Sequence, residues 1–248
     1  MTIDLNCDLG EGSGHDAELM PLITSVNIAC GAHAGDPATM RATVALALAQ
    51  GVAIGAHPGF ADRKNFGRKE IVISPREAGE LVLTQWQALA QVATAAGARV
   101  THLKLHGALY ILAARGQALA EGVVDAVRRI ESRPILVCLA GSVLERLARG
   151  TGGVRVAAEV FADRTYQRDG ALTPRTQPGA LIEDPAVAVA QVLRMVREGV
   201  VRATDGSEVP IRAETLCLHG DGAQAVEFAR RIRKELAAAG VVVRAFKP

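Results

Sequence analysis

The sequence predicts an α/β fold in which about seven parallel strands and their connecting helices close into one barrel. Short aliphatic runs alternate along the chain with longer stretches rich in Ala and Leu at helical spacing, a rhythm typical of strands joined by crossover helices. Polar clusters follow most of the short runs, and a length of 248 residues is ordinary for one barrel. We therefore expect a single domain over residues 1–248.

The expected strands are punctuated by helix signals. The strands are predicted at residues 3–7, 25–29, 52–56, 100–105, 135–139, 154–161 and 215–218, with a terminal strand at 241–244. Asp36-Pro37, Ser74-Pro75 and Asp184-Pro185 each combine a capping residue with a proline at the first helical position. Residues 162–183 form the one long irregular stretch, which is interpreted either as a lid or as a surface loop.

Composition excludes several classes of function. Hydrophobic residues make up 49% and charged residues 22%, which indicates a globular chain. The net charge is +2 and aromatic residues are only 3%, so a nucleic-acid partner is not expected. There is no apolar stretch long enough to cross a membrane and no C-x-x-C pair among the four cysteines, and residues 1–12 lack the basic segment and apolar run expected of a signal peptide. These features predict a cytoplasmic protein with reduced thiols.

The first two predicted strands end in polar, glycine-rich turns. Asn6, Asp8 and Glu11 follow the first strand, where the backbone can approach a ligand closely, although helix capping would also explain the carboxylates. His33 lies in a turn before a helix and is poorly placed for core packing, but it could simply bond the turn backbone. Asp36 can be either a helix cap or an active-site carboxylate.

The third and fourth strands end in histidines. Pro58 fixes an extended backbone that directs His57 out of the strand end. His102, Lys104 and His106 alternate along the fourth strand and therefore share one face. A lysine inside a barrel must be paired or functional, and we predict site roles for Lys104 and His106, whereas His102 could be structural.

The remaining polar clusters follow the sixth and seventh strands. Glu159 is a candidate site carboxylate, and the alternative for Lys104 is an ordinary salt bridge to Glu159 or another carboxylate. Arg164 can clamp an anion or brace the loop. His219 and Asp221 lie between a strand and a helix start, where backbone N–H groups can hold an anion, although Asp221 could instead cap that helix.

Acids, histidines and a lysine that converge on one cavity suit polar acyl chemistry at a carbonyl group. The chain contains no G-x-S-x-G elbow, which leaves a serine acyl-enzyme without support. It also contains neither a G-x-x-x-x-G-K-[ST] phosphate loop nor a dinucleotide-binding glycine motif. Any nucleotide must therefore bind in another way.

Several motifs together resemble the LamB/YcsF family. They are DLNCDLGEG from Asp4, NIACGAHAGDP from Asn27, GAHP, HGALY, EVFADR and the late HGD. They occur in the family's order and spacing from residue 3 to about residue 221. Three positions depart from the family pattern: Leu105 replaces a frequent proline, and Ser13 and Ala32 replace frequent aromatic residues, which we expect to alter pocket shape more than chemistry.

This resemblance implies a (β/α) barrel of the glycoside hydrolase/deacetylase-like type. It also implies a subunit of a prokaryotic 5-oxoprolinase, which acts with two other subunits to open the lactam 5-oxoproline to L-glutamate, with ATP as cosubstrate. By motif position, the implied catalytic residues are Asp8, His33, His57, Lys104, His106 and Glu159. The implied substrate-binding residues are Asn6, Glu11, Asp36, Arg164, His219 and Asp221.

Two other functions stay open from the sequence. The kinship with deacetylases suggests a divalent-metal-dependent deacetylase of an acetamido sugar, in which Asp8, His33 and His57 would bind the metal. A non-catalytic, partner-binding subunit is the second alternative. The sequence leaves the metal requirement and self-association of the chain undecided.

Overall fold

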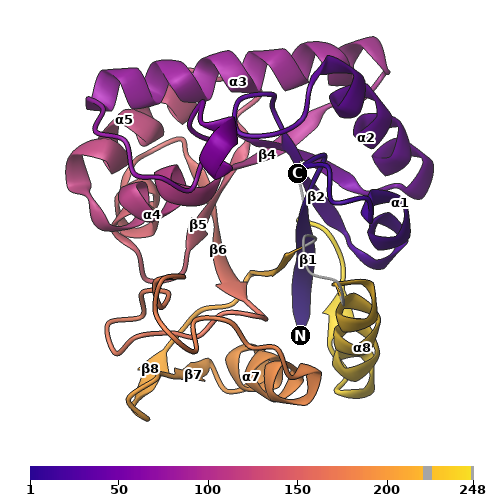
Figure 1. Ribbon diagram of the computed structural model, residues 1–248, viewed down its shortest axis with the longest axis vertical. Coiled ribbons are helices and arrows are strands. Elements are labelled where there is room, and N and C mark those ends of the chain that lie inside the picture. Colours follow the sequence, from indigo (N-terminus) through magenta and orange to yellow (C-terminus); the bar gives the residue numbers. More distant parts are fainter. Residues whose placement is uncertain (220–224, 247–248) are drawn as a thin grey trace.

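The computed structural model describes residues 1–219 and 225–246 and contains the predicted barrel (Figure 1). Seven parallel strands pair in the order β1-β2-β3-β4-β5-β6-β9, and pairing of β9 with β1 closes the ring. The strands are β1 Thr2–Leu9, β2 Ser25–Ala29, β3 Ala53–His57, β4 Val100–Lys104, β5 Ile135–Leu139, β6 Arg155–Phe161 and β9 Thr215–His219. The predicted fold class is thus confirmed.

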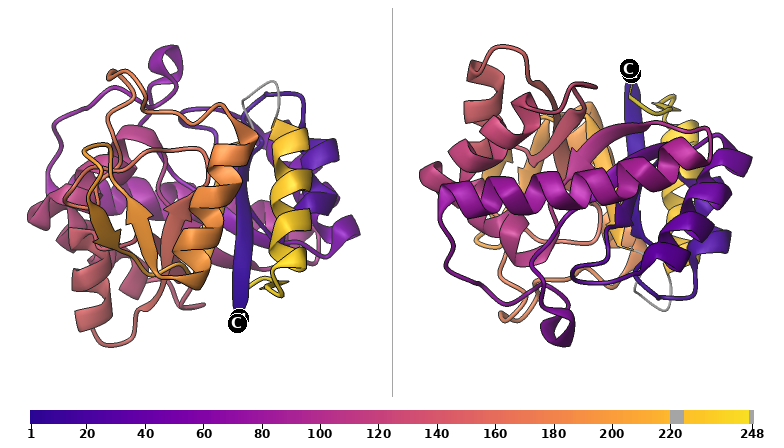
Figure 2. Two further views of the ribbon diagram at one scale, coloured as in Figure 1. Left: turned by 90° about the horizontal axis from the view of Figure 1, so that it is seen from below. Right: turned by 90° about the horizontal axis from the view of Figure 1, so that it is seen from above.

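Helices surround the strands. In Figure 1, α3 covers one side of the barrel and α7 and α8 lie on the opposite side, and Figure 2 shows α7 beside α8. Asp36, Ser74 and Asp184 cap the helices that their sequence signals predicted. The helices are α1 Asp16–Leu19, α2 Pro37–Gln50, α3 Pro75–Ala95, α4 Gly107–Arg115, α5 Gln117–Arg128, α6 Val143–Gly150, α7 Pro185–Arg197 and α8 Ala225–Ala238, with 3-10 turns η1 Met20–Leu22 and η2 Arg63–Asn65.

Three short strands lie outside the ring. β7 (Val200–Arg202) and β8 (Glu208–Pro210) form an antiparallel hairpin that the sequence analysis did not predict, because strands this short carry no readable alternation. β10 (Val242–Val243) is the expected terminal strand, and it pairs with the start of β1. The irregular stretch after β6 folds back on itself through isolated bridges, one of them between Arg164 and Leu181.

The alternation of side chains along β1 separates a polar interior from an apolar exterior. Asp4, Asn6 and Asp8 point into the barrel, where they bond residues of neighbouring strands. The intervening residues belong to the main hydrophobic cluster, which packs between the strands and the helices: Ile3, Leu5, Cys7 and Leu9. The barrel lumen is therefore available for chemistry, while the apolar layer outside it supplies the core.

A small apolar group lies inside the barrel toward the amino ends of the strands. Ile135, Val137 and Ala157 form it, and Phe246 from the end of the chain packs against them. The Phe246 ring also meets the His102 ring edge-on, with centroids 5.5 Å apart. This apolar group therefore covers the polar side chains of the barrel interior on the side of the strands' amino ends.

Within residues 1–219 and 225–246, every helix is too short or too polar to cross a lipid bilayer.

Gly55 on β3 leaves the space that the His102 ring occupies. A Cβ atom added at Gly55 would lie 2.1 Å from His102 Nε2, and the ring is held in place by contacts with Asn27 and Thr101. We expect Gly55→Ala to lower the free energy of unfolding by about 1–3 kcal/mol, because the overpacked ring must move. Chemical denaturation measures this value.

Gly150→Ala is the matched control, since a Cβ there meets nothing within 4 Å and Gly150 ends helix α6. Its unfolding free energy should stay within about 0.5 kcal/mol of the parent value or rise slightly. Equal stability of the Gly55→Ala protein and the parent would show that His102 does not fill this space.

Candidate active site

A buried lysine lies at the centre of the lumen. Lys104, at the end of β4, is 2% exposed. Its Nζ lies 2.9 Å from Asp8 Oδ1, 2.9 Å from Glu159 Oε1 and 3.0 Å from Cys217 Sγ. Burial alone would lower the pKa of Lys104, but the carboxylate of Asp8, with help from Glu159, raises it well above its ordinary value. The site thus contains a fixed ammonium between two carboxylates.

Glu159 is held from several directions. It is fully buried, and its Oε1 accepts a hydrogen bond of 3.0 Å from Asn6 Nδ2 in addition to the contact with Lys104. Its Oε2 accepts a hydrogen bond of 2.7 Å from the Tyr110 hydroxyl. Asn6 also donates to Thr215 Oγ1. Glu159 therefore helps fix the position of Lys104 from a place that water does not reach.

Asp8 lies nearer to solvent than Glu159 and connects Lys104 to the histidines. It is 8% exposed, its Oδ1 accepts a 2.8 Å hydrogen bond from Asn27 Nδ2, and its Oδ2 lies 3.3 Å from His57 Nε2. Burial would raise the pKa of Asp8, but the positive charges of His57 and Lys104 outweigh it and hold the pKa well below its usual range. Asp8 is therefore an ionised carboxylate with one side toward the opening.

Glu11 and three histidines form a second group, which we call the histidine cluster. Glu11 Oε1 lies 3.0 Å from His33 Nε2, 3.2 Å from His106 Nδ1 and 3.8 Å from His57 Nε2. His106 Nδ1 is 3.0 Å from His57 Nε2. The rings of His33 and His106 stack with centroids 3.7 Å apart. Four site residues predicted from separate motifs thus meet at one point.

The protonation tendencies within this cluster differ. Burial lowers the pKa of His33 to about 4 and also lowers the pKa of His106. Burial acts in the same direction on His57, but the charge of Asp8 raises the pKa of His57 above its ordinary value. Hydrogen bonds from His106 and His33 overcome the effect of burial and lower the pKa of Glu11. Of the three histidines, His57 is therefore the one whose protonated form its surroundings favour.

His219 and Asp163 form the outer edge of the site. His219 Nδ1 lies 2.7 Å from Asp163 Oδ2, and their side chains are 15% and 20% exposed. Burial raises the pKa of Asp163, but the facing His219 outweighs this effect and lowers it. Exposure increases from Glu159 through Asp8 to His219, so the site opens at the carboxyl end of the barrel.

Two predicted site residues are not brought into this group, and a third is not among the described residues. Asp36 is exposed and caps α2, accepting a hydrogen bond of 2.7 Å from the Thr39 amide, so the capping interpretation describes its position. Arg164 is buried and donates to the carbonyl oxygens of Thr173 and Ala180, which means that it braces the loop after β6. Asp221 lies outside the described residues.

The sequence analysis missed two residues that organise the site. Asn27 donates to both Asp8 and Asn6, and it stands inside the NIACGAHAGDP run. Tyr110 stands inside HGALY and lies one helical turn after His106, which places its hydroxyl on Glu159. The motifs contained both signals, but an asparagine within an apolar strand and an aromatic residue in a helix both suggest ordinary packing.

His102 has a structural place deeper in the barrel. Its Nε2 lies 3.0 Å from Asn27 Oδ1, and its Nδ1 lies 3.1 Å from Thr101 Oγ1. Burial and the charge of Lys104 lower its pKa to about 3. His102 is thus a neutral ring beneath the charged layer.

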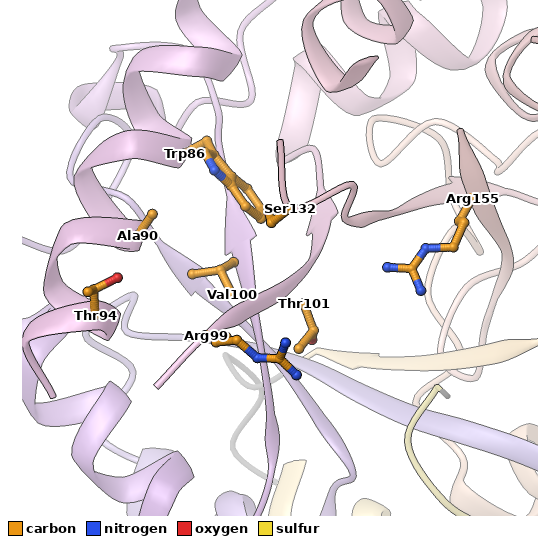
Figure 3. A pocket seen from close by; sticks show the side chains of 8 residues that line it. All are labelled: Trp86, Ala90, Thr94, Arg99, Val100, Thr101, Ser132 and Arg155. Carbon is orange, nitrogen blue, oxygen red and sulfur yellow. The ribbon is translucent and has the colours of Figure 1, made fainter. Parts of the chain in front are cut away.

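A separate cavity of about 200 Å³ lies at the other end of the barrel, beside the amino ends of β4 and β6. Figure 3 shows the guanidinium groups of Arg99 and Arg155 pointing into the space between them. Arg155 is partly engaged, since it donates to the carbonyl oxygen of Arg133. The lining contains no predicted site residue: Trp86, Ala90, Thr94, Arg99, Val100, Thr101, Ser132 and Arg155.

Two groups of described side chains have the donor types and spacing that suit a metal ion. One is the histidine cluster, and the other comprises Asp8, Cys217 and His219. The set expected from the sequence divides differently, because His33 and His57 lie with Glu11 and His106 and only His57 also touches Asp8. The arrangement as a whole offers a carboxylate base, a fixed cation and a chain of proton-exchanging groups.

Comparison with known proteins identifies relatives over the entire chain. The A subunit of 5-oxoprolinase from Bordetella pertussis is 54% identical over 98% of each chain. A protein of the same name from Bacillus subtilis is 51% identical over 98% of this chain and 96% of its own. The crystal structure of a lactam utilization protein from Thermus thermophilus superposes with a TM-score of 0.92 at 47% identity, covering 99% of this chain and all of the other.

More distant likeness concerns the fold. A family 4 carbohydrate esterase from Streptomyces lividans covers the whole chain and 93% of its own length with a TM-score of 0.53, but at 10% identity. The family model described as LamB/YcsF family matches residues 3–248. The resemblance predicted from the strand-end motifs is thereby confirmed, and the chain belongs to the LamB/YcsF family.

Proposed function

We propose that this chain is a subunit of a 5-oxoprolinase that opens the lactam ring of 5-oxoproline to L-glutamate with ATP as cosubstrate. The observation that carries the proposal is the end-to-end match, at 54% identity, to relatives named as the A subunit of 5-oxoprolinase. Two partner subunits belong to the proposal, as does a cytoplasmic location, where ATP is available. The buried group around Lys104 supplies chemistry that suits a hydrolase acting on a cyclic amide.

A five-membered lactam resists water because resonance lowers the reactivity of its carbonyl carbon. Transfer of the terminal phosphoryl group of ATP to the carbonyl oxygen, with release of ADP, removes that protection. Water can then add to the carbon, the ring C–N bond can break as the nitrogen takes up a proton, and hydrolysis of the resulting acyl phosphate releases phosphate and leaves the free carboxylate. The protein must then hold the water, stabilise negative charge on oxygen and deliver a proton to the ring nitrogen.

Asp8 is our candidate for the group that orients the attacking water. It is ionised and is the most exposed of the carboxylates around Lys104, whereas Glu159 is fully buried. Lys104 lies 2.9 Å from Asp8 and stabilises negative charge at this point. Glu159 contacts Lys104 on its buried side and holds the ammonium in position.

The histidine cluster offers a route for protons away from Asp8. His57 Nε2 lies 3.3 Å from Asp8 Oδ2 and 3.0 Å from His106 Nδ1, which in turn lies 3.2 Å from Glu11. A proton taken from water can therefore pass along hydrogen-bonded groups. We assign His219, at the outer edge, to substrate binding, and Asn6 to holding Glu159 in place.

The deacetylase alternative is supported by the fold alone, since the esterase neighbour is only 10% identical. We therefore do not favour it. A non-catalytic role as a partner-binding subunit is separated from our proposal by substitution of site residues in the assembled enzyme.

Replacement of Asp8 by Asn tests the catalytic proposal. The variant keeps the volume and part of the hydrogen bonding but loses the charge next to Lys104. We expect glutamate formation from 5-oxoproline and ATP by the reconstituted complex to fall at least about 100-fold. Turnover is measured as glutamate released, after gel filtration has shown that the complex assembles.

Asp205→Asn is the matched control, because Asp205 lies exposed between β7 and β8, where it accepts hydrogen bonds from Ser207. It should retain the parent rate. A near-normal rate for Asp8→Asn in an intact complex would instead favour the non-catalytic alternative.

A second experiment tests substrate, cosubstrate and partnership together. Glutamate release is followed with this chain alone, then with its candidate partner subunits, each with and without ATP. We expect release only when the partners and ATP are both present, because the chain has no recognised phosphate loop of its own. ATP-independent release by the chain alone, or no release from the full mixture, would refute the proposal.

A further inference from the structure

We propose that the histidine cluster is a binding site for one divalent transition-metal ion of the zinc type. This goes beyond the proposed function, which requires no metal at this position. The ligand atoms are Glu11 Oε1, His33 Nε2, His57 Nε2 and His106 Nδ1, all within 4.8 Å of one another. Three imidazoles and one carboxylate are a donor set that zinc and its neighbours prefer.

The hydrogen bonds on the outer side of two rings fix which nitrogen atoms face the cluster. His57 Nδ1 lies 2.9 Å from the carbonyl oxygen of Lys104, and His106 Nε2 lies 2.8 Å from the carbonyl oxygen of Phe66. A carbonyl oxygen only accepts, so both of these nitrogens carry hydrogen. In the neutral rings, His57 Nε2 and His106 Nδ1 therefore present lone pairs to each other.

Besides each other, the side chains that these lone pairs contact among the described residues are the carboxylates of Asp8 and Glu11, which are acceptors. The two ring nitrogens lie 3.0 Å apart, and Glu11 Oε1 is within 3.8 Å of both. Lone pairs that converge at such distances repel unless a cation lies among them. One proton on His57 could serve only one of its neighbours at a time, whereas a metal ion satisfies all of them together.

The spacing also fits tetrahedral coordination. Zinc bonds to nitrogen and oxygen of about 2.0–2.1 Å place tetrahedral ligand atoms about 3.3–3.4 Å apart. The measured separations between cluster atoms are 3.0 Å for His57 to His106, 3.0 Å for Glu11 to His33, 3.2 Å for Glu11 to His106 and 3.8 Å for Glu11 to His57. These four of the six separations lie within about 0.5 Å of that spacing.

Two glycines make room for the rings. A Cβ at Gly59 would lie 2.9 Å from His33 Nδ1, and a Cβ at Gly67 would lie 2.8 Å from His33 Cβ. Carbonyl partners on His57 and His106 are the usual means of orienting metal-binding imidazoles. The residues around the cluster therefore leave room for the imidazole rings and orient two of them toward a shared metal position.

Charge favours this cluster over the neighbouring candidate group. When the three imidazoles are neutral, as metal ligands are, Asp8, Glu11 and Glu159 carry three negative charges against the one ammonium of Lys104. This part of the described interior then has an excess of two negative charges that a divalent ion would offset. The alternative group contains Asp8 and Cys217, and the Lys104 ammonium lies 2.9 Å and 3.0 Å from these two residues. That position is already taken by a cation.

Metal binding is tested on the untagged, full-length chain without substrate, ATP or partners, so its outcome is distinguishable from that of the proposed function. The protein is stripped with a chelator and titrated with Zn²⁺ or Co²⁺. We expect about one ion per chain by elemental analysis after desalting, visible Co²⁺ absorption of low-coordinate type, and a rise in melting temperature.

Substitutions locate the ion. Glu11→Gln and His106→Gln should each weaken binding at least about 100-fold and abolish the rise in melting temperature. His15→Gln is the matched control, because His15 is a partly exposed histidine outside the cluster, and it should bind as the parent does. Cys217→Ser should also bind normally, and circular dichroism verifies that each variant is folded.

Three results would overturn the proposal. They are the absence of stoichiometric binding by the parent chain, undiminished binding by both Glu11→Gln and His106→Gln, and loss of binding in folded Cys217→Ser. If His106→Gln does not fold, Glu11→Gln and the titration of the parent still decide the question.

Discussion

The site depends on the placement of one buried ammonium. Lys104 can remain charged inside the barrel only because Asp8 and Glu159 each lie 2.9 Å from it, and removal of either partner would leave an uncompensated charge in the interior. These three residues come from β4, β1 and β6, so the contact holds only when the strands close in this register. The chemistry at the carboxyl end therefore requires the complete ring.

A barrel interior with buried charges can be tolerated because the hydrophobic core that stabilises the fold lies outside the barrel, between the strands and the helices. On β1, every second residue packs outward into the apolar layer beneath the helices, while Asp4, Asn6 and Asp8 point inward. Burial raises the pKa of Asp4 to about 6, even though three hydroxyl groups donate to it. Phe246 covers the amino end of this polar column. Core and site thus occupy opposite faces of the same strands.

The sequence predicted the barrel and most of the site because both follow from short-range patterns. The alternation along β1 and the histidines at strand ends are visible without knowledge of distant contacts. The roles of Asp36 and Arg164 could not be decided in this way, since helix caps and loop braces use the same residue types as ligand-binding sites. Their local roles follow from hydrogen bonds that the structure shows, between Asp36 and Thr39 and between Arg164 and Ala180. Asn27 looked like strand interior, and its partners lie on another strand.

His57 links the two halves of the site and makes their proposed roles compete. Its Nε2 lies 3.3 Å from Asp8 and 3.0 Å from His106, yet it has a single lone pair in the neutral ring. A metal ion bound there would prevent His57 from accepting a proton from Asp8, and a proton on Asp8 would then leave toward the opening, where His219 and Asp163 lie. With no metal bound, the same nitrogen is free to carry the proton toward Glu11. Metal occupancy would therefore determine whether protons leave the site through the histidine cluster or through its opening to solvent.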